Sequence, residues 1–85
     1  MKQFTYVIKD ELGIHARPAG LLVKEAKKFG STITLICGEK NASAKGLISV
    51  MGLGAKQGNE VTVTAEGEDE NEAIVALEAF FNGNF

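Results

Sequence analysis

The chain has few of the residues on which many common kinds of site depend. Its 85 residues include one cysteine, one histidine, one proline and no tryptophan. One cysteine cannot form an internal disulfide, and one histidine with one cysteine cannot supply the three or four ligands of a usual zinc site. We therefore expect neither a metal centre nor a resident cofactor.

The chain also lacks the apolar segments of a membrane-spanning or secreted protein. No apolar run approaches the roughly 20 residues that a membrane-spanning helix needs, and the first residues lack the apolar core of a signal peptide. These absences predict no membrane insertion and a cytoplasmic location. The net charge of -2 is also unfavourable for a protein that must neutralise the phosphates of a nucleic acid, so no nucleic-acid partner is expected.

What the chain does have is a clear change of hydrophobic period. Residues 2–8 alternate between polar and apolar, which predicts a half-buried strand. In residues 16–29 apolar side chains recur at helical spacing, which predicts a helix with Pro18 in its first turn and Gly30 as its stop.

The rest of the chain continues this alternation of strands and helices. Asp69 begins a segment that resembles a capping box, and Gly83 is expected to end the last helix. The order β-α-β-β-α-β-α predicts an α+β fold in one domain, residues 1–85, with one antiparallel sheet covered on one face by three helices. The remaining predicted strands are residues 31–37, 41–44 and 59–65, and the remaining predicted helices are residues 46–53 and the segment after Asp69.

The segment Gly13-Ile14-His15-Ala16-Arg17-Pro18-Ala19 is the best candidate for a chemical site. His15 falls at the start of the predicted helix, where free backbone N–H groups, those of Ala16 and Arg17, and the helix dipole attract anions. Arg17 adds a planar cation that fits phosphate oxygens. This positive surrounding favours a neutral, nucleophilic imidazole that could hold a phosphoryl group. A surface or capping histidine is the alternative, and spacing alone leaves both open.

The same segment resembles the active-site signature of HPr, the histidine-containing phosphocarrier family of the bacterial sugar phosphotransferase system. The segments 50–54 and 67–70 resemble two further stretches of that family, so the likeness covers nearly the whole chain. The resemblance implies an open-faced β-sandwich. It also implies that Nδ1 of His15 takes a phosphoryl group from Enzyme I and passes it to the IIA domain of a sugar permease, with Arg17 steadying the phosphate.

Five further residues have both a structural and a functional interpretation. In the short helix, Leu47, Ile48 and Met51 could be core residues, but eight residues cannot bury every apolar side chain. The resemblance implies that they form a docking patch beside the histidine. Lys24 and Lys27 are either a solvated helix face or a means of steering acidic partners.

The chain departs from the family at position 46. Many members carry there a serine on which an ATP-dependent kinase acts, and this chain has Gly46. A serine kinase and a catabolite regulator are therefore partners in doubt, with Ser49 or Ser43 as alternative targets.

Two other classes of function remain as alternatives. The first is a purely regulatory HPr-like module, which the His15–Arg17 pair opposes. The second is an RNA-binding α+β domain, which the acidic composition and the lack of paired strand aromatics oppose. The sequence does not name the sugars served, because sugar choice lies in the permease.

Overall fold

The computed structural model describes all 85 residues, and its elements follow the predicted order. None of its helices combines the length and the apolar character that crossing a membrane requires. The elements are β1 (Lys2–Val7), α1 (Ala16–Ala26), β2 (Thr32–Cys37), β3 (Lys40–Ser43), α2 (Leu47–Gly52), β4 (Glu60–Glu66) and α3 (Glu70–Asn84).

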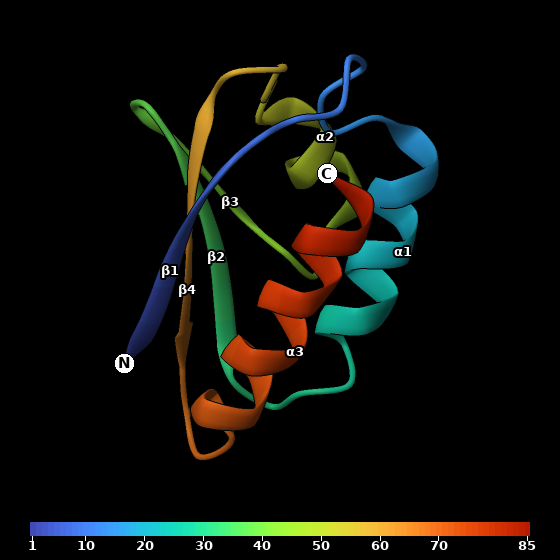
Figure 1. Cartoon of the computed structure of the whole chain (residues 1–85). Coiled ribbons are helices and arrows are strands. Elements are labelled where there is room, and N and C mark those ends of the chain that lie inside the picture. Colours follow the sequence, from blue (N-terminus) through green and yellow to red (C-terminus); the bar gives the residue numbers. More distant parts are fainter.

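The four strands form one antiparallel sheet in the order β1-β4-β2-β3. The three helices lie together on one face of this sheet, and the other face is left open (Figure 1). In the middle of the sheet, Val63 of β4 pairs with Phe4 of β1 on one side and with Leu35 of β2 on the other. Thr34 and Thr64 pair on the open face and are partly exposed to solvent. The predicted α+β, open-faced sandwich is therefore confirmed.

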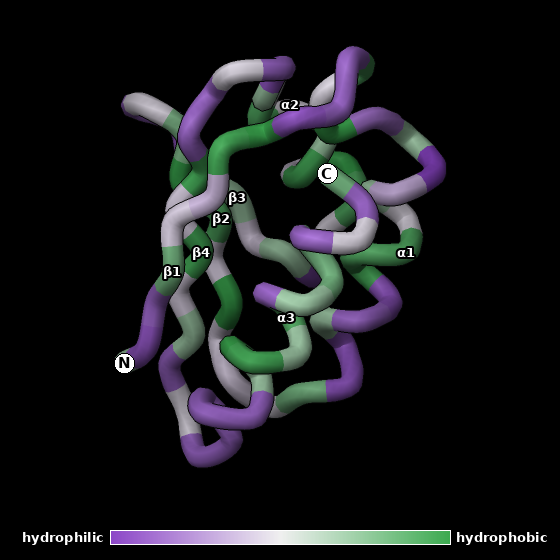
Figure 2. Tube along the Cα trace, viewed as in Figure 1, coloured by the Kyte–Doolittle hydropathy of each residue, from purple (hydrophilic) through white to green (hydrophobic).

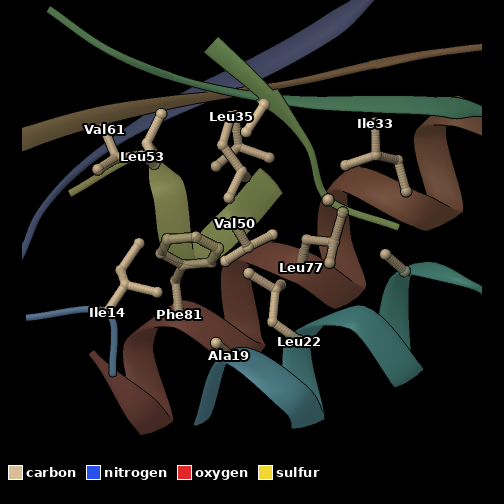
Figure 3. Close-up of a cluster of buried hydrophobic side chains, with 14 of the residues drawn as sticks. Ile14, Ala19, Leu22, Ile33, Leu35, Val50, Leu53, Val61, Leu77 and Phe81 are labelled. Atoms are coloured by element: carbon tan, nitrogen blue, oxygen red, sulfur yellow. The ribbon is translucent and has the colours of Figure 1, made fainter. Parts of the chain in front are cut away.

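The core fills the space between the sheet and the helices (Figure 3). Phe81 of α3 lies at its centre and is fully buried. Its ring meets Phe4 and Tyr6 edge-on, each at 5.6 Å between centroids, and Phe85 at 5.0 Å. Burial of these aromatic rings therefore fixes α3 against β1. The turn before α3, in contrast, carries mostly hydrophilic residues (Figure 2).

Two predicted helix ends differ from those in the structure. Helix α1 ends at Ala26, and Gly30 does not adopt the left-handed conformation of a helix stop. Its amide instead donates to Asp69 at 2.9 Å, so a tertiary contact determines its conformation. Gly83 lies inside α3, which continues to Asn84. We attribute this extension to Phe85, because its burial against Phe81 stabilises the last turn.

The predicted capping box at Asp69 is also wrong. Asp69 is the N-cap of α3, but its carboxylate makes no bond to the first turn of that helix. It accepts hydrogen bonds from the amides of Gly30 and Ser31 and from the Ser31 hydroxyl. The carboxylate therefore joins α3 to the start of β2, a partner that sequence spacing could not reveal.

Candidate functional site

The loop that leads from β1 to α1 is held in place by the C-terminal residue. The amides of Lys9 and Asp10 both donate to the backbone oxygen of Phe85, at 2.6 and 3.0 Å. The Phe85 ring is only 4% exposed and packs against Phe80 and Phe81. The beginning of the loop thus lies beside the C-terminal end of α3 (Figure 1), and the buried Phe85 ring links it to the hydrophobic core.

The end of the loop is fastened to the segment that follows α2. Gly13 has a φ of +66°, and a Cβ atom there would lie 2.3 Å from the carbonyl oxygen of Ala55. The amide of Ile14 donates to the same oxygen at 3.1 Å, and the Ile14 side chain is buried in the core. Only glycine fits at position 13, because both the backbone conformation and the space exclude a side chain. The backbone of Ile14, the residue before His15, is therefore held in a fixed position.

His15 is the N-cap of α1, with an extended backbone. Its carbonyl accepts the amide of Ala19 at 2.9 Å, and Pro18 has no amide hydrogen. The first turn thus keeps two N–H groups without a helical partner, those of Ala16 and Arg17. The imidazole makes no capping bond to them, and its side chain is 34% exposed. The imidazole therefore does not cap α1 through its side chain, although the surface interpretation of His15 stays open. An incoming anion could reach both the ring and the amides.

Asp10 is the neighbour of His15 that the sequence did not reveal. Its Oδ2 atom lies 3.4 Å from Nε2 of His15, and its Oδ1 atom accepts the amide of Leu12 at 2.8 Å. The Leu12 amide, with a smaller contribution from His15, holds the pKa of Asp10 below its ordinary 3.8. The carboxylate is therefore ionised at neutral pH. A carboxylate in a short turn five positions before a histidine was the only signal in the sequence.

Arg17 stands on the solvent side of the first turn of α1. It is exposed, and its guanidinium forms no hydrogen bond or ion pair with another residue. No internal carboxylate neutralises this cation, so its charge is available to a bound anion or to a partner.

Helix α2 presents an apolar surface, which we call the α2 patch: Leu47, Ile48 and Met51. These side chains are 44%, 85% and 41% exposed, whereas Val50 on the opposite side of the helix is fully buried. The core interpretation is therefore wrong for all three. Helix α2 packs against α1 (Figure 1). The segment after α2 also carries Ala55, which holds the residue before His15.

The two lysines named from the sequence lie at the far end of α1 from His15. Both Lys24 and Lys27 are exposed and form no ion pair, whereas Lys28 pairs with Glu25 at 3.0 Å. At a rise of about 1.5 Å per residue, Lys24 lies roughly 13 Å along the helix from His15. The lysines thus contribute charge to the same helix and not to the histidine site itself.

At position 46 the structure has no side chain to modify. Gly46 is the N-cap of α2, and a Cβ atom there would lie 3.3 Å from the hydroxyl oxygen of Ser49. Ser43 accepts the amide of Lys45 at 3.2 Å. Ser43 and Ser49 are both exposed, one on each side of Gly46.

The site does not lie in a pocket. One hollow of about 350 Å³ is lined by Gly30, Glu68 and Asp69, at the other end of the fold. A second hollow, of about 280 Å³, includes Asp10 and Phe85 but not His15. His15 therefore lies on an open surface, which suits contact with a large partner better than binding of a small substrate.

An open-faced sandwich that presents one accessible histidine at a helix start fits the class of small carrier proteins. Comparison with known proteins supports this class. Residues 2–83 match the family described as the PTS HPr component phosphorylation site. The chain belongs to the HPr family of phosphocarrier proteins.

Individual relatives agree with this assignment. The phosphocarrier protein HPr of Mycoplasma capricolum is 46% identical over 77 residues, which cover 91% of this chain and 86% of that protein. The crystal structure of HPr from Thermoanaerobacter tengcongensis has a TM-score of 0.92 and 46% identity, and the match covers 98% of this chain and 93% of that one. Crh, a catabolite repression protein of Bacillus subtilis, has a TM-score of 0.78 and 38% identity, and the match covers 98% of this chain and 95% of that one.

Proposed function

We propose that this protein relays a phosphoryl group on His15, taking it from Enzyme I and giving it to the IIA domain of a sugar permease. The observation that carries the proposal is the partly exposed imidazole at the start of α1, beside the unpartnered amides of Ala16 and Arg17. In this proposal Nδ1 is the phosphorylated atom, and the 85 residues act as one HPr-like domain in the cytoplasm.

The first turn of α1 supplies what a phosphohistidine needs. The phosphoryl group carries close to two negative charges at neutral pH, and it requires hydrogen-bond donors that do not already have an acceptor. The amides of Ala16 and Arg17 are such donors, and the helix dipole adds to their attraction. Arg17 adds a permanent charge with a geometry that fits two phosphate oxygens. Because the first turn of α1 fixes the two amides before transfer, little backbone reorganisation is needed.

The partners would dock on two adjoining surfaces. The α2 patch offers an exposed apolar area, and its Met51 has the flexible side chain that suits contact with several different proteins. Along α1, Arg17 and Lys24 are seven residues apart and thus lie on nearly the same helix face, with Lys27 one turn further. These cations would attract an acidic partner surface, so Enzyme I and the IIA domain would meet apolar and basic contacts together.

Regulation through a serine kinase and a catabolite regulator is not part of the proposal. Gly46 has no hydroxyl group, and the similarity to Crh does not restore one. Modification at Ser49 or Ser43 remains the alternative. The His15–Arg17 pair favours a carrier over a purely regulatory module, and the net charge of -2 opposes RNA binding.

A phosphotransfer assay tests the proposal directly. The protein is incubated with phosphoenolpyruvate and Enzyme I, and the product is examined by intact mass and by its stability in acid. We expect one acid-labile phosphoryl group, which disappears in His15→Ala and then passes to a IIA domain when one is added. Absence of the label on the folded wild-type protein would exclude the relay.

A further inference from the structure

We propose that Asp10 is a positioning residue for His15: its carboxylate holds the ring in the tautomer with hydrogen on Nε2 and so leaves Nδ1 with a free lone pair. This inference rests on the proposed relay role of His15 and adds a residue and a mechanism to it. The carrying observation is the contact of 3.4 Å between Oδ2 of Asp10 and Nε2 of His15.

The direction of this contact follows from the chemistry of its two atoms. An ionised carboxylate accepts hydrogen bonds and cannot donate them, so a bond to Nε2 requires the hydrogen on that nitrogen. In a neutral imidazole the other nitrogen, Nδ1, is then the unprotonated one. The contact thus selects the nucleophilic atom of His15 before any partner arrives.

The structure also holds Asp10 itself in place. Its second oxygen, Oδ1, accepts the amide of Leu12 at 2.8 Å, so the orientation of the carboxylate is fixed by the loop backbone. Its own amide donates to the backbone oxygen of Phe85 at 3.0 Å, and the buried ring of Phe85 anchors that oxygen. A carboxylate held at both ends loses little entropy when it meets the imidazole, which is the requirement for a positioning residue.

The transfer step balances with Asp10 in this role. The lone pair of Nδ1 forms the bond to phosphorus, and the bond between phosphorus and the donor breaks, its electron pair leaving with the donor. The ring keeps the hydrogen on Nε2 and gains a positive charge, which the Asp10 carboxylate faces at 3.4 Å. No proton has to move in this step, and the reverse sequence releases the phosphoryl group to the next acceptor.

Asp10→Asn is the most informative variant because it places a hydrogen-bond donor, in place of an acceptor, opposite Nε2 of His15. The amide side chain has one oxygen, which would keep accepting from the Leu12 amide, so its NH₂ group would face Nε2. That arrangement requires an unprotonated Nε2 and places the hydrogen on Nδ1, the wrong tautomer for attack. The carboxylate-to-amide change in the Ser-His-Asp triad has the same logic. Asp10→Ala, in contrast, only removes the contact that favours the tautomer with hydrogen on Nε2.

Two measurements on the wild type, Asp10→Asn, Asp10→Ala and the exposed neighbour variant Glu11→Gln test the proposal. Imidazole ¹⁵N chemical shifts, recorded where His15 is neutral, give the tautomer, and the Enzyme I assay gives the rate of phosphoryl acceptance. We expect Nε2–H in the wild type and in Glu11→Gln, a mixture in Asp10→Ala and Nδ1–H in Asp10→Asn. The rate should fall about tenfold in Asp10→Ala and further in Asp10→Asn.

The two measurements separate this inference from the relay itself. A wild-type ring with hydrogen on Nδ1, or an Asp10→Asn variant that accepts phosphate as fast as the wild type, would overturn the role of Asp10. A wild type with the expected tautomer but no acceptance from Enzyme I would exclude the relay and leave the positioning intact. If one of the two Asp10 variants does not fold, the change of tautomer in the other, folded variant relative to the wild type decides the question.

Discussion

The carboxylate of Asp69 accepts hydrogen bonds from both the hydroxyl and the amide of Ser31, a residue 38 positions earlier in the chain. Ser31 is 1% exposed, so its polar groups have no access to water. The same carboxylate also accepts the amide of Gly30 at 2.9 Å. One side chain thus joins the start of β2 to the start of α3.

Replacing Asp69 with alanine should lower the melting temperature by several degrees, because buried donors of Ser31 lose their acceptor. The Ser31 hydroxyl first, and the Gly30 amide next, hold the pKa of Asp69 below its ordinary 3.8. A lowered carboxylate pKa contributes stability that is present above the ordinary value and is lost as the pH falls through the native value. The difference in melting temperature between the wild type and Asp69→Ala should therefore shrink below pH 3.8. Thermal unfolding followed by circular dichroism measures it.

The exposed neighbour Glu68 supplies the control for this prediction. Glu68→Gln removes a charge of the same sign without removing a hydrogen bond, and its melting temperature should follow that of the wild type. A gap between Asp69→Ala and the wild type that is equal at neutral and acidic pH would show that the ionised carboxylate is not what stabilises this junction.

Gly13 and Gly38 form a matched pair for testing how the histidine loop is held. Both have positive φ values, +66° and +63°, so alanine strains the backbone by about 1 kcal/mol at either position. At Gly38 a Cβ atom meets nothing within 4 Å, but at Gly13 it meets the Ala55 carbonyl at 2.3 Å. Gly13→Ala should therefore lose more stability in urea and also accept phosphate more slowly. Equal losses and equal rates in the two variants would contradict this account.

Ile48 and Val75 provide a matched pair for testing the docking surface. They are exposed apolar side chains on different helices, 85% and 68% accessible. Ile48→Asp places a charge in the α2 patch and should raise the KM for phosphoryl transfer from Enzyme I by about 30-fold, as a central interface residue does. Val75→Asp on α3 should leave KM unchanged, and both variants should keep their stability within about 0.5 kcal/mol. An equal effect on KM would place the docking surface elsewhere.

Gly46→Ser tests whether the lack of a hydroxyl group at position 46 is what prevents phosphorylation by a serine kinase. Serine is slightly better than glycine at a helix N-cap, and the Ser49 hydroxyl 3.3 Å away needs to move only slightly. We expect a nearly unchanged melting temperature and a gain of one phosphate from ATP and an HPr serine kinase. The wild type should remain unmodified by mass spectrometry. Phosphate found on wild-type Ser49 or Ser43 would show that a neighbouring serine has taken over.

The sequence predicted well those features that depend on near neighbours in the chain. The alternation in residues 2–8 and the helical period after His15 predicted β1 and α1, because each reports directly which face of one element is apolar. The same local pattern placed His15 at a helix start. Helix ends were less predictable: α1 ends four residues before Gly30, whose amide instead meets Asp69, and α3 continues past Gly83, where the burial of Phe85 stabilises the last turn.

By itself, therefore, the sequence determined the order of the elements, their inward faces and the histidine with its two helix amides. Only the tertiary structure decided which carboxylate meets the imidazole and which apolar side chains of α2 remain outside. The reason is physical: periodicity depends on near neighbours, whereas the Asp10–His15 contact requires a loop fixed by Phe85 and Ala55, residues 75 and 45 positions away from Asp10. The exposure of the α2 patch likewise follows from the orientation in which a six-residue helix packs on the core.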